Sequence, residues 1–274
     1  MTRVKPYATS GPLFEIMETT TYGWGFPPNL STYGPEIDRL IVVVHWFMLA
    51  LFVGWGCFLI YCLIRFRQKP GWKASYESSH SIIPKIVEVG VVIFEAFLLI
   101  GLSFPVWSKF KNQFPPEQSS LVIRVVAQQF VWNIHYPGRD GQFGKTDVTL
   151  VSDGNPLGVD PADPAGKDDI ITVNQLHFPV HKPVIVHLSS KDVIHSFSIP
   201  VLRVKQDAVP GAPGSVWFEA TQTGQFEIAC AQLCGVGHTL MRGFVTVETP
   251  EEYEAWMKER EAELQPAGTV LVTP

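Results

Sequence analysis

Two long apolar segments lie in the first part of the chain. The first, Leu40–Ile64, contains 25 residues without Asp, Glu, Lys or Arg. At about 1.5 Å per residue it reaches about 37 Å, enough to cross a bilayer. The second, Val89–Trp107, is interrupted only by Glu95 and would span about 28 Å. We interpret the pair as a transmembrane hairpin, because helices buried in soluble proteins rarely exceed roughly 20 residues and keep a polar edge.

Charged residues beside these segments predict how the hairpin is oriented. The connecting loop carries one acid, Glu77, and five basic residues: Arg65, Arg67, Lys69, Lys73 and Lys85. The outer flanks are mixed, with Arg39, Lys109 and Lys111 beside Glu36, Asp38 and Glu117. Because cytoplasmic loops are enriched in Lys and Arg, we expect the loop in the cytoplasm and both ends of the chain outside.

The rest of the chain has a different pattern. Residues 1–38 lack the apolar core of a signal peptide, so we expect an irregular arm on the outer face. After Pro116 come short runs of β-branched and aromatic residues separated by turn residues: Leu121–Ala127, Pro183–Leu188, Val216–Ala220 and Gly243–Val247. They predict an antiparallel sandwich or barrel of about 130 residues. A long polar loop is expected over Gly138–Asp169 and a surface helix over Pro250–Leu264.

These segments divide the chain into four predicted parts. They are an outer-face arm over residues 1–38, a transmembrane hairpin over 39–110, a β domain over 117–250, and a C-terminal helix and tail over 251–274. Charged residues make up only 17% of the chain and the net charge is −5. This composition excludes a disordered chain and gives no basic surface for nucleic acid. Four cysteines are too few for a disulfide scaffold of this size.

The candidate chemistry is concentrated in one short stretch. Cys230, Cys234, His238 and Met241 lie within twelve residues, among glycines that allow a tight loop. A further histidine, His195, lies on a strand-like stretch upstream. Thiolate, imidazole and thioether together favour copper over hard cations. A mononuclear blue-copper site needs only one thiolate, so the second cysteine favours two coppers bridged by both sulfurs, with the backbone carbonyl of Gln232 as the sixth donor.

Other interpretations of these residues stay open at this point. Cys230 and Cys234 could form a disulfide, which is common outside the cytoplasm. A zinc site of two Cys and two His would fit the spacing loosely but would leave Met241 unused. Cys57 and Cys62 lie inside the first apolar segment, where we expect them to be small packing residues.

Taken together, these motifs resemble subunit II of the haem–copper cytochrome c oxidases, over roughly Ile37 to Val247. The resemblance rests on His195-Ser-Phe, on the stretch Lys205-Gln-Asp207-Ala-Val-Pro-Gly, and on Cys-x3-Cys-x3-His-x2-Met. It implies a membrane-anchored α+β fold, with a cupredoxin-type Greek-key β-barrel above a two-helix transmembrane hairpin. It also implies an energy-transducing membrane, expected to be a bacterial inner membrane, with the copper domain on the periplasmic side.

The resemblance also assigns the metal ligands of a dinuclear copper A centre. One copper would take His195 and Met241, the other His238 and the Gln232 carbonyl, with the thiolates of Cys230 and Cys234 shared. Magnesium is a weaker expectation than copper, because Gln232 stands where many relatives have a magnesium-binding glutamate, and a neutral amide is a poorer ligand.

The implied function is electron transfer in a proton-pumping terminal oxidase. Electrons would come from cytochrome c and pass to the haem–copper subunit I, the main partner together with other oxidase subunits. The chain has no Cys-x-x-Cys-His motif, so the donor is expected to be a separate c-type cytochrome. A copper A domain of another reductase and a membrane-anchored copper carrier are the alternative functions.

Three further positions are candidate functional residues by the same resemblance. Phe130 and Trp132 form the expected electron-uptake patch, with Phe130 in place of a Trp. That replacement favours a donor tethered to the membrane or held in a supercomplex, while a soluble donor stays open. Glu88 aligns with a glutamate that admits protons to subunit I. For Glu95, seven residues further along the same helix face, lining that route and a packing role both stay open.

Overall fold

The computed structural model describes residues 25–73, 76, 81–264 and 272–273. Its contacts divide the chain into two units, one of Pro35–Gln113 and one of Met1–Gly34 with Phe114–Pro274. Each unit is described separately below. Residues 1–24 of the expected arm lie outside the described residues, and residues 34–38 are helical rather than irregular.

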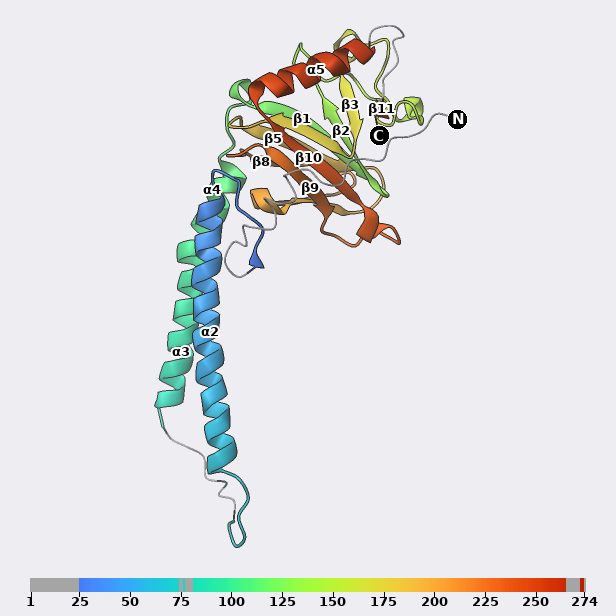
Figure 1. Ribbon diagram of the computed structural model, residues 1–274. Coiled ribbons are helices and arrows are strands. Elements are labelled where there is room, and N and C mark those ends of the chain that lie inside the picture. The colour runs from blue at the N-terminus through green and yellow to red at the C-terminus, as the bar shows by residue number, and fades with distance from the viewer. Residues whose placement is uncertain (1–24, 74–75, 77–80, 265–271, 274) are drawn as a thin grey trace, which may run out of the picture. The chain divides into compact units, whose positions relative to one another are not determined.

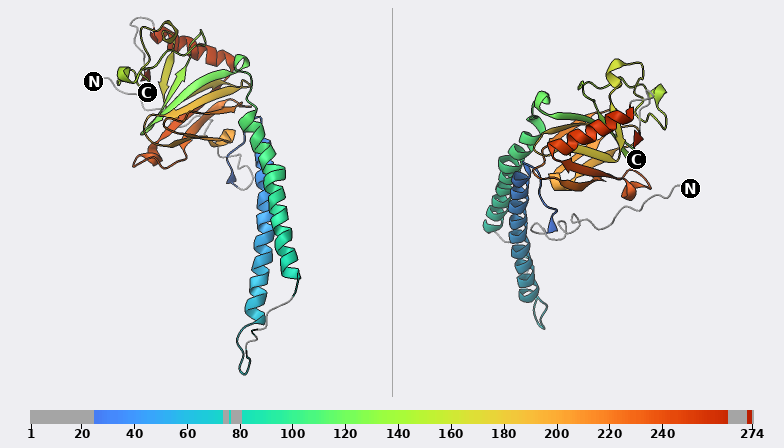
Figure 2. Two further views of the ribbon diagram at one scale, coloured as in Figure 1. Left: turned by 180° about the vertical axis from the view of Figure 1, so that it is seen from behind. Right: turned by 45° about the horizontal axis from the view of Figure 1, so that its top comes forward.

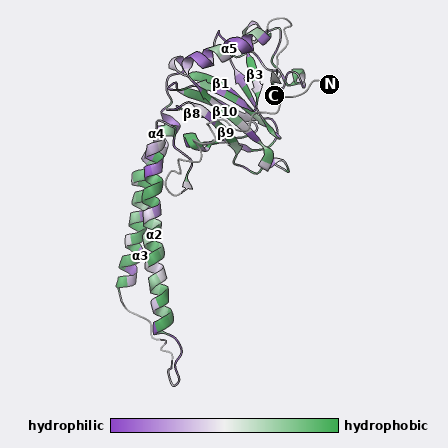
Figure 3. Ribbon diagram, in the orientation of Figure 1, coloured by the Kyte–Doolittle hydropathy of each residue, from purple (hydrophilic) through white to green (hydrophobic). Residues whose placement is uncertain are grey.

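The smaller unit contains the two apolar segments as helices (Figure 1). Helix α2 spans Gly34–Arg65. The second helical stretch comprises α3 (Ile83–Ala96), a π-helical segment η2 (Phe97–Ser103) and α4 (Phe104–Asn112). Both exceed the predicted apolar segments because the flanking polar residues continue the helices. Each is long and apolar enough to cross a membrane, and in Figure 3 both helical stretches are coloured mostly as hydrophobic.

Contacts between the two stretches hold the hairpin together. The rings of Phe47 and Phe94 lie 4.8 Å apart between their centroids, and Lys109 forms an ion pair with Glu36. The π-helical segment precedes Pro105, which has no N–H to donate. The Ser103 hydroxyl donates to the Leu98 carbonyl at 3.0 Å and so satisfies a backbone group of this irregular turn.

The larger unit is a β-sandwich of two sheets (Figures 1 and 2). One sheet has six strands in the order β11-β3-β2-β1-β5-β8 and the other has five in the order β4-β10-β9-β6-β7. The six-stranded sheet contains β1 (Leu121–Gln128), β2 (Val131–Tyr136), β3 (Ile170–Val173), β5 (Val184–Ser190), β8 (Gly214–Phe218) and β11 (Val272–Thr273). The five-stranded sheet contains β4 (Gln175–Pro179), β6 (His195–Ile199), β7 (Val204–Ala208), β9 (Gly224–Cys230) and β10 (Arg242–Glu248).

Strand pairing differs in one respect from the predicted antiparallel arrangement. The pairs β1–β5, β4–β10 and β3–β11 are parallel. Parallel neighbours need a crossover connection, as Greek-key topologies provide. Short alternating runs indicate strands but not their partners, so the sequence predicted the sandwich without these parallel pairs.

The core lies between the two sheets, and strand alternation decides which side chains enter it. On β1, Ile123, Val125 and Ala127 are buried, whereas Arg124 and Val126 lie on the opposite face. Helix α5 spans Pro250–Leu264, as the acid-rich start of that segment predicted. The expected loop over 138–169 contains two 3-10 turns. It also buries Leu157 and Val159 against Ile171, so it covers one sheet face.

Candidate metal centre

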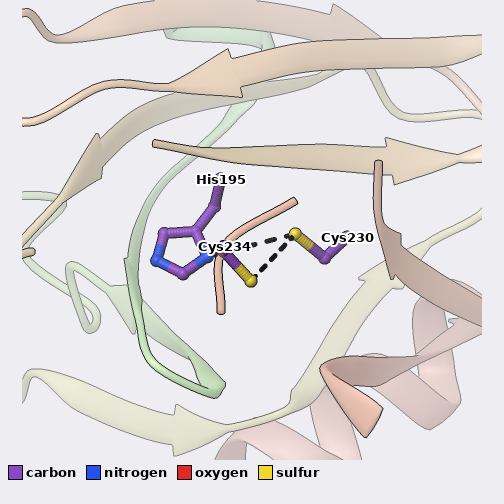
Figure 4. A group of neighbouring side chains, drawn as sticks. All are labelled: His195, Cys230 and Cys234. Atoms are coloured by element: carbon purple, nitrogen blue, oxygen red, sulfur yellow. Dashed lines mark hydrogen bonds between the residues drawn. The ribbon is translucent and has the colours of Figure 1, made fainter. Parts of the chain in front are cut away.

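The candidate ligands come from two adjacent strands and the loop that follows one of them. His195 is the first residue of β6 and Cys230 is the last residue of β9, and these strands pair antiparallel with Phe197 opposite Cys230. Cys234, His238 and Met241 lie between β9 and β10. The strand register therefore places His195 beside the loop, although it is 35 residues before Cys230. Figure 4 shows the His195 ring and the two thiols gathered together.

All six predicted donor atoms lie close to one of the two sulfurs. Cys230 Sγ is 3.2 Å from the Gln232 carbonyl oxygen and 4.0 Å from His195 Nδ1. Cys234 Sγ is 3.6 Å from His238 Nδ1 and 3.8 Å from Met241 Sδ. The sulfurs themselves are 3.8 Å apart, and both cysteines are free rather than joined in a disulfide. Two imidazoles, two thiols and a thioether form a set that suits a soft or borderline cation.

The loop between Cys230 and Met241 is closed by backbone hydrogen bonds and close packing. Cys230 N–H donates to the Met241 carbonyl at 3.3 Å, and Met241 N–H donates to the Gly237 carbonyl at 3.1 Å. Gly235 has φ +134°, and a Cβ there would lie 2.7 Å from Gln129 Nε2. Only glycine accommodates both the backbone angle and this approach. The loop conformation thus depends on contacts with the segment around Gln129.

A carboxylate outside the predicted ligand set connects the parts of this site. Asp192 Oδ1 lies 2.9 Å from His195 Nε2, and its Oδ2 accepts the Gln129 backbone N–H at 2.7 Å. The Gln129 side chain in turn donates to the Cys234 carbonyl at 2.6 Å. Partial burial acts to raise the pKa of Asp192. The hydrogen bonds from Gln129, His195 and Val193 outweigh that effect, so its pKa is lowered. Asp192 is therefore an anion that orients the imidazole.

The thiols are enclosed unevenly. Cys234 and Met241 are buried and His195 is fully buried, whereas Cys230 is half-buried. Burial, and then the neighbouring Cys230 thiol, raise the pKa of the Cys234 thiol to about 11. Without a cation this thiol keeps its proton at neutral pH, so metal binding has to displace that proton.

The two aromatic residues of the expected electron-uptake patch have different positions. Trp132 is fully buried, and its ring lies edge-on to the His195 imidazole with centroids 6.2 Å apart. It therefore cannot touch a docked protein. Phe130 is half-buried beside the glycines of the loop between Cys230 and Met241, since a Cβ on Gly237 would lie 2.5 Å from its ring.

The remaining candidate residues belong to the smaller unit, which is described by itself. Glu88 and Glu95 are on α3 in the helical unit, and both side chains are exposed in the isolated chain. Sequence reasoning missed the roles of Asp192 and Gln129. The one available signal was an acid three residues before the strand histidine, which alone does not distinguish a hydrogen-bond partner from a turn residue.

Comparison with known proteins gives these observations a family context. The family described as "Cytochrome C oxidase subunit II, periplasmic domain" matches residues 121–248. The alternative cytochrome c oxidase subunit 2 of Bradyrhizobium diazoefficiens is 35% identical over 238 residues, covering 86% of this chain and 84% of that protein. Cytochrome c oxidase subunit 2 of Cereibacter sphaeroides is 28% identical over 265 residues, covering 91% and 84%. The crystal structure of the periplasmic domain of a Bradyrhizobium japonicum cytochrome oxidase subunit II aligns with a TM-score of 0.41 and 29% identity, covering 56% of this chain and 99% of that one.

The fold and the site define a class first. Two helices long and apolar enough to cross a membrane, together with a β-sandwich that carries a cluster of His and Cys side chains, define a membrane-anchored protein with a candidate metal-binding domain. Within that class, the chain belongs to the cytochrome c oxidase subunit II family. It is thus a subunit of a haem–copper oxidoreductase complex, and its family is one that binds copper A.

Proposed function

We propose that this chain holds a dinuclear copper A centre, accepts electrons there from a separate c-type cytochrome and delivers them to the haem–copper subunit I. Bound copper would supply one-electron redox chemistry. Family membership supports electron transfer within the oxidase. The geometry of the donors supports two copper ions rather than one.

The observation that carries the two-ion proposal is the distribution of donors around the sulfurs. Cys230 Sγ lies near His195 and the Gln232 carbonyl, and Cys234 Sγ lies near His238 and Met241. In the expected ligand scheme His195 and Met241 belong to one ion, and His238 and Gln232 to the other. Each thiol is therefore adjacent to one donor of each ion, as a bridging thiolate requires. A mononuclear site would leave two or more of these donors unused.

Burial of the donors argues against a copper carrier. His195, Cys234 and Met241 are at most 4% exposed. Hydrogen bonds of Asp192 and Gln129 also connect His195 on β6 with the loop that contains Cys234. A carrier needs ligands that exchange metal readily, whereas enclosed ligands with fixed hydrogen-bond partners suit a permanent centre. The same rigidity limits movement on reduction, which favours rapid electron transfer.

The rim of the site supports docking by apolar contact. Leu233, Val236 and Leu240 are at least 78% exposed, and the loop between Cys230 and Met241 has no charged residue. Exposed apolar side chains around a buried centre are typical of a protein-docking surface. We assign this rim, together with Phe130, to the c-type cytochrome. The cationic hairpin loop supports placing the rim on the periplasmic side.

Electron paramagnetic resonance of the copper-loaded full chain in mild detergent tests the proposal. A seven-line hyperfine pattern with two coppers per chain is the expected result, because one unpaired electron is shared by two copper nuclei. A four-line pattern with one copper per chain would contradict the dinuclear centre. A silent, readily chelated copper would instead favour a carrier.

A further inference from the structure

A second site lies on the outer face of the six-stranded sheet. There, a cavity of about 580 Å³ is roofed by the loop over 138–169 and lined by no candidate copper ligand. Its floor comes from β1, β2 and β5, and its roof from residues 146–157. A cavity of this size is typical of small-molecule sites.

Arg124, one of the lining residues, has unused hydrogen-bonding capacity. Its guanidinium lies over the Phe143 ring, 4.0 Å from the centroid, and it donates no hydrogen bond to any residue in the described part of the chain. A guanidinium carries five N–H donors in a planar fork that matches a carboxylate. Desolvation lowers the pKa of Arg124, although Asp169 opposes this. The cavity therefore holds a partly desolvated cation without a directly bonded anion.

The neighbouring charges do not neutralise Arg124 by contact. Asp169 is buried, with Oδ2 2.6 Å from His135 Nε2 and 2.9 Å from the Gly144 backbone nitrogen. Asp147 accepts hydrogen bonds from both the backbone and the hydroxyl of Thr149. Asp147 is thus held by Thr149 and Asp169 is held through Oδ2, while Asp169 Oδ1 has no hydrogen-bond partner in the described part of the chain.

Lys191 adds a second positive charge to the same cavity. Its ammonium group donates to the Gln128 side chain and to the Pro156 carbonyl, both of which are neutral. Of its three N–H donors, one is left for a ligand. Burial lowers the pKa of Lys191, with Asp192 opposing, and the charge of a bound anion would offset this cost of burying a cation, as it would for Arg124.

Four apolar side chains also line the cavity, beside the polar side chains of Thr146, Asp147 and Ser189. Val126 is on β1, and Val148, Val151 and Leu157 belong to the loop over 138–169. Val148 is 84% exposed and Val151 is 44% exposed, so both side chains have apolar surface that a ligand could bury. A ligand with a hydrocarbon chain would cover them, whereas a purely inorganic anion would not.

From this combination we infer that the cavity binds an organic carboxylate with an apolar chain. Its carboxylate pairs with the fork of Arg124 and with Lys191, and its chain lies along Val148, Val151 and Leu157. The site is separate from the copper centre in its lining but adjoins it in sequence, because Lys191 precedes the Asp192 that holds His195. It is a ligand site in addition to the proposed electron-transfer function and does not depend on it.

Calorimetric titration of the full chain in dodecyl maltoside with sodium octanoate tests the inference, with heats from empty micelles subtracted. We expect saturable binding of one octanoate per chain. Octan-1-ol, which has the chain without the charge, and inorganic phosphate, which has charge without the chain, should each bind at least about tenfold more weakly.

Three variants localise the binding. Arg124→Gln should weaken octanoate at least about tenfold through loss of the charged pair. Val148→Glu places a like charge beside the carboxylate at an exposed position, where folding is not at risk, and should weaken binding several-fold. Lys182→Gln removes an exposed cation elsewhere and should change nothing. If Arg124→Gln fails to fold, the octanoate affinity of Val148→Glu is sufficient to test the location of the site.

Four results would overturn the inference. They are no saturable octanoate binding at millimolar concentration, equal binding of octanol or of phosphate, equal weakening by Lys182→Gln, and unchanged binding in Val148→Glu.

Discussion

Asp192 and His195 are joined by a hydrogen bond on the side of the imidazole that faces away from the sulfurs. Asp192 Oδ1 is 2.9 Å from His195 Nε2, while His195 Nδ1 is the nitrogen nearest Cys230 Sγ. The carboxylate therefore keeps the proton on Nε2 and leaves the Nδ1 lone pair for a metal. The same carboxylate accepts the Gln129 N–H. The Asp192 side chain therefore fixes both the candidate ligand His195 and the segment around Gln129, which contacts the loop between Cys230 and Met241.

Replacing Asp192 by Asn should weaken copper binding without unfolding the domain. The amide is nearly isosteric, but it lacks the negative charge that fixes the imidazole tautomer. Loss of such an outer hydrogen-bond partner typically lowers metal affinity about 10- to 100-fold. Competition with a copper chelator measures the change. Asp153→Asn, at an exposed loop carboxylate, is the control, and an equal loss in both variants would show that Asp192 has no special role.

The two kinds of sulfur ligand should respond differently to substitution. Cys230→Ser or Cys234→Ser should abolish the mixed-valence spectrum, because an alkoxide does not bridge with comparable covalency. Met241→Leu should only shift the potential and weaken the site, since an axial thioether is a long, weak ligand. Cys62→Ser in α2 is the control and should leave the spectrum unchanged. A wild-type spectrum in either cysteine variant at the loop would exclude bridging.

Much of the candidate metal centre could be identified from the sequence because five of the six candidate donors lie in twelve consecutive residues. Ligand type and spacing are local properties, and they were sufficient to identify Cys230, Cys234, His238 and Met241 as candidates. The role of Asp192 was not predictable in the same way. It depends on how the turn between β5 and β6 places a carboxylate behind His195, which is a tertiary relationship.

The fold was predicted where the pattern alone decides the structure. The first apolar segment lies within helix α2, and the acid-rich segment that begins at Pro250 forms helix α5, as predicted. The parallel pairing of β1 with β5 could not be predicted, because alternation specifies faces but not neighbours. The loop over 138–169 was expected to be a polar surface segment. In the structure the loop buries Leu157 and Val159 against the outer face of the six-stranded sheet. The sequence of the loop alone does not show that this face lies beside it.

Gly237→Ala should destabilise the domain through Phe130. A Cβ at this position would lie 2.5 Å from Cδ2 of the Phe130 ring, and overpacking of this kind costs about 1–3 kcal/mol. Chemical denaturation of the metal-free chain measures the loss. Gly154→Ala, where a Cβ would meet nothing within 4 Å, is the control. Adding Phe130→Leu should recover part of the loss, and no recovery would place the strain elsewhere.

Glu88→Ala should slow turnover of the assembled oxidase while leaving copper reduction normal. The hypothesis is that this carboxyl group in the first half of α3 admits protons to subunit I, a step that follows electron uptake. Stopped-flow reduction of the copper centre and steady-state oxygen consumption separate the two steps. Glu88→Asp should retain part of the turnover. Unchanged turnover in Glu88→Ala would remove the proton-uptake role.

The apolar rim makes a specific prediction about salt. Electrostatically steered association slows steeply as ionic strength rises, whereas apolar docking does not. Because Leu233, Val236 and Leu240 are exposed and the copper loop has no charge, reduction by the physiological donor should depend only weakly on salt. Val236→Lys should lower the rate of copper reduction by placing a charge in the middle of this contact.

Phe130 is the residue through which electrons from a donor on the rim should reach the metal centre. Trp132 is fully buried against His195, so of these two aromatic residues only Phe130 can touch a donor. An indole in its place would offer a larger face and an N–H donor. If the natural donor is tethered or held in a larger assembly, a soluble cytochrome c should reduce the wild-type centre slowly, and Phe130→Trp should accelerate it. The measurement is stopped-flow reduction by soluble cytochrome c across ionic strength. A fast, strongly salt-dependent wild-type rate that Phe130→Trp does not improve would instead identify a freely diffusing, charge-steered donor.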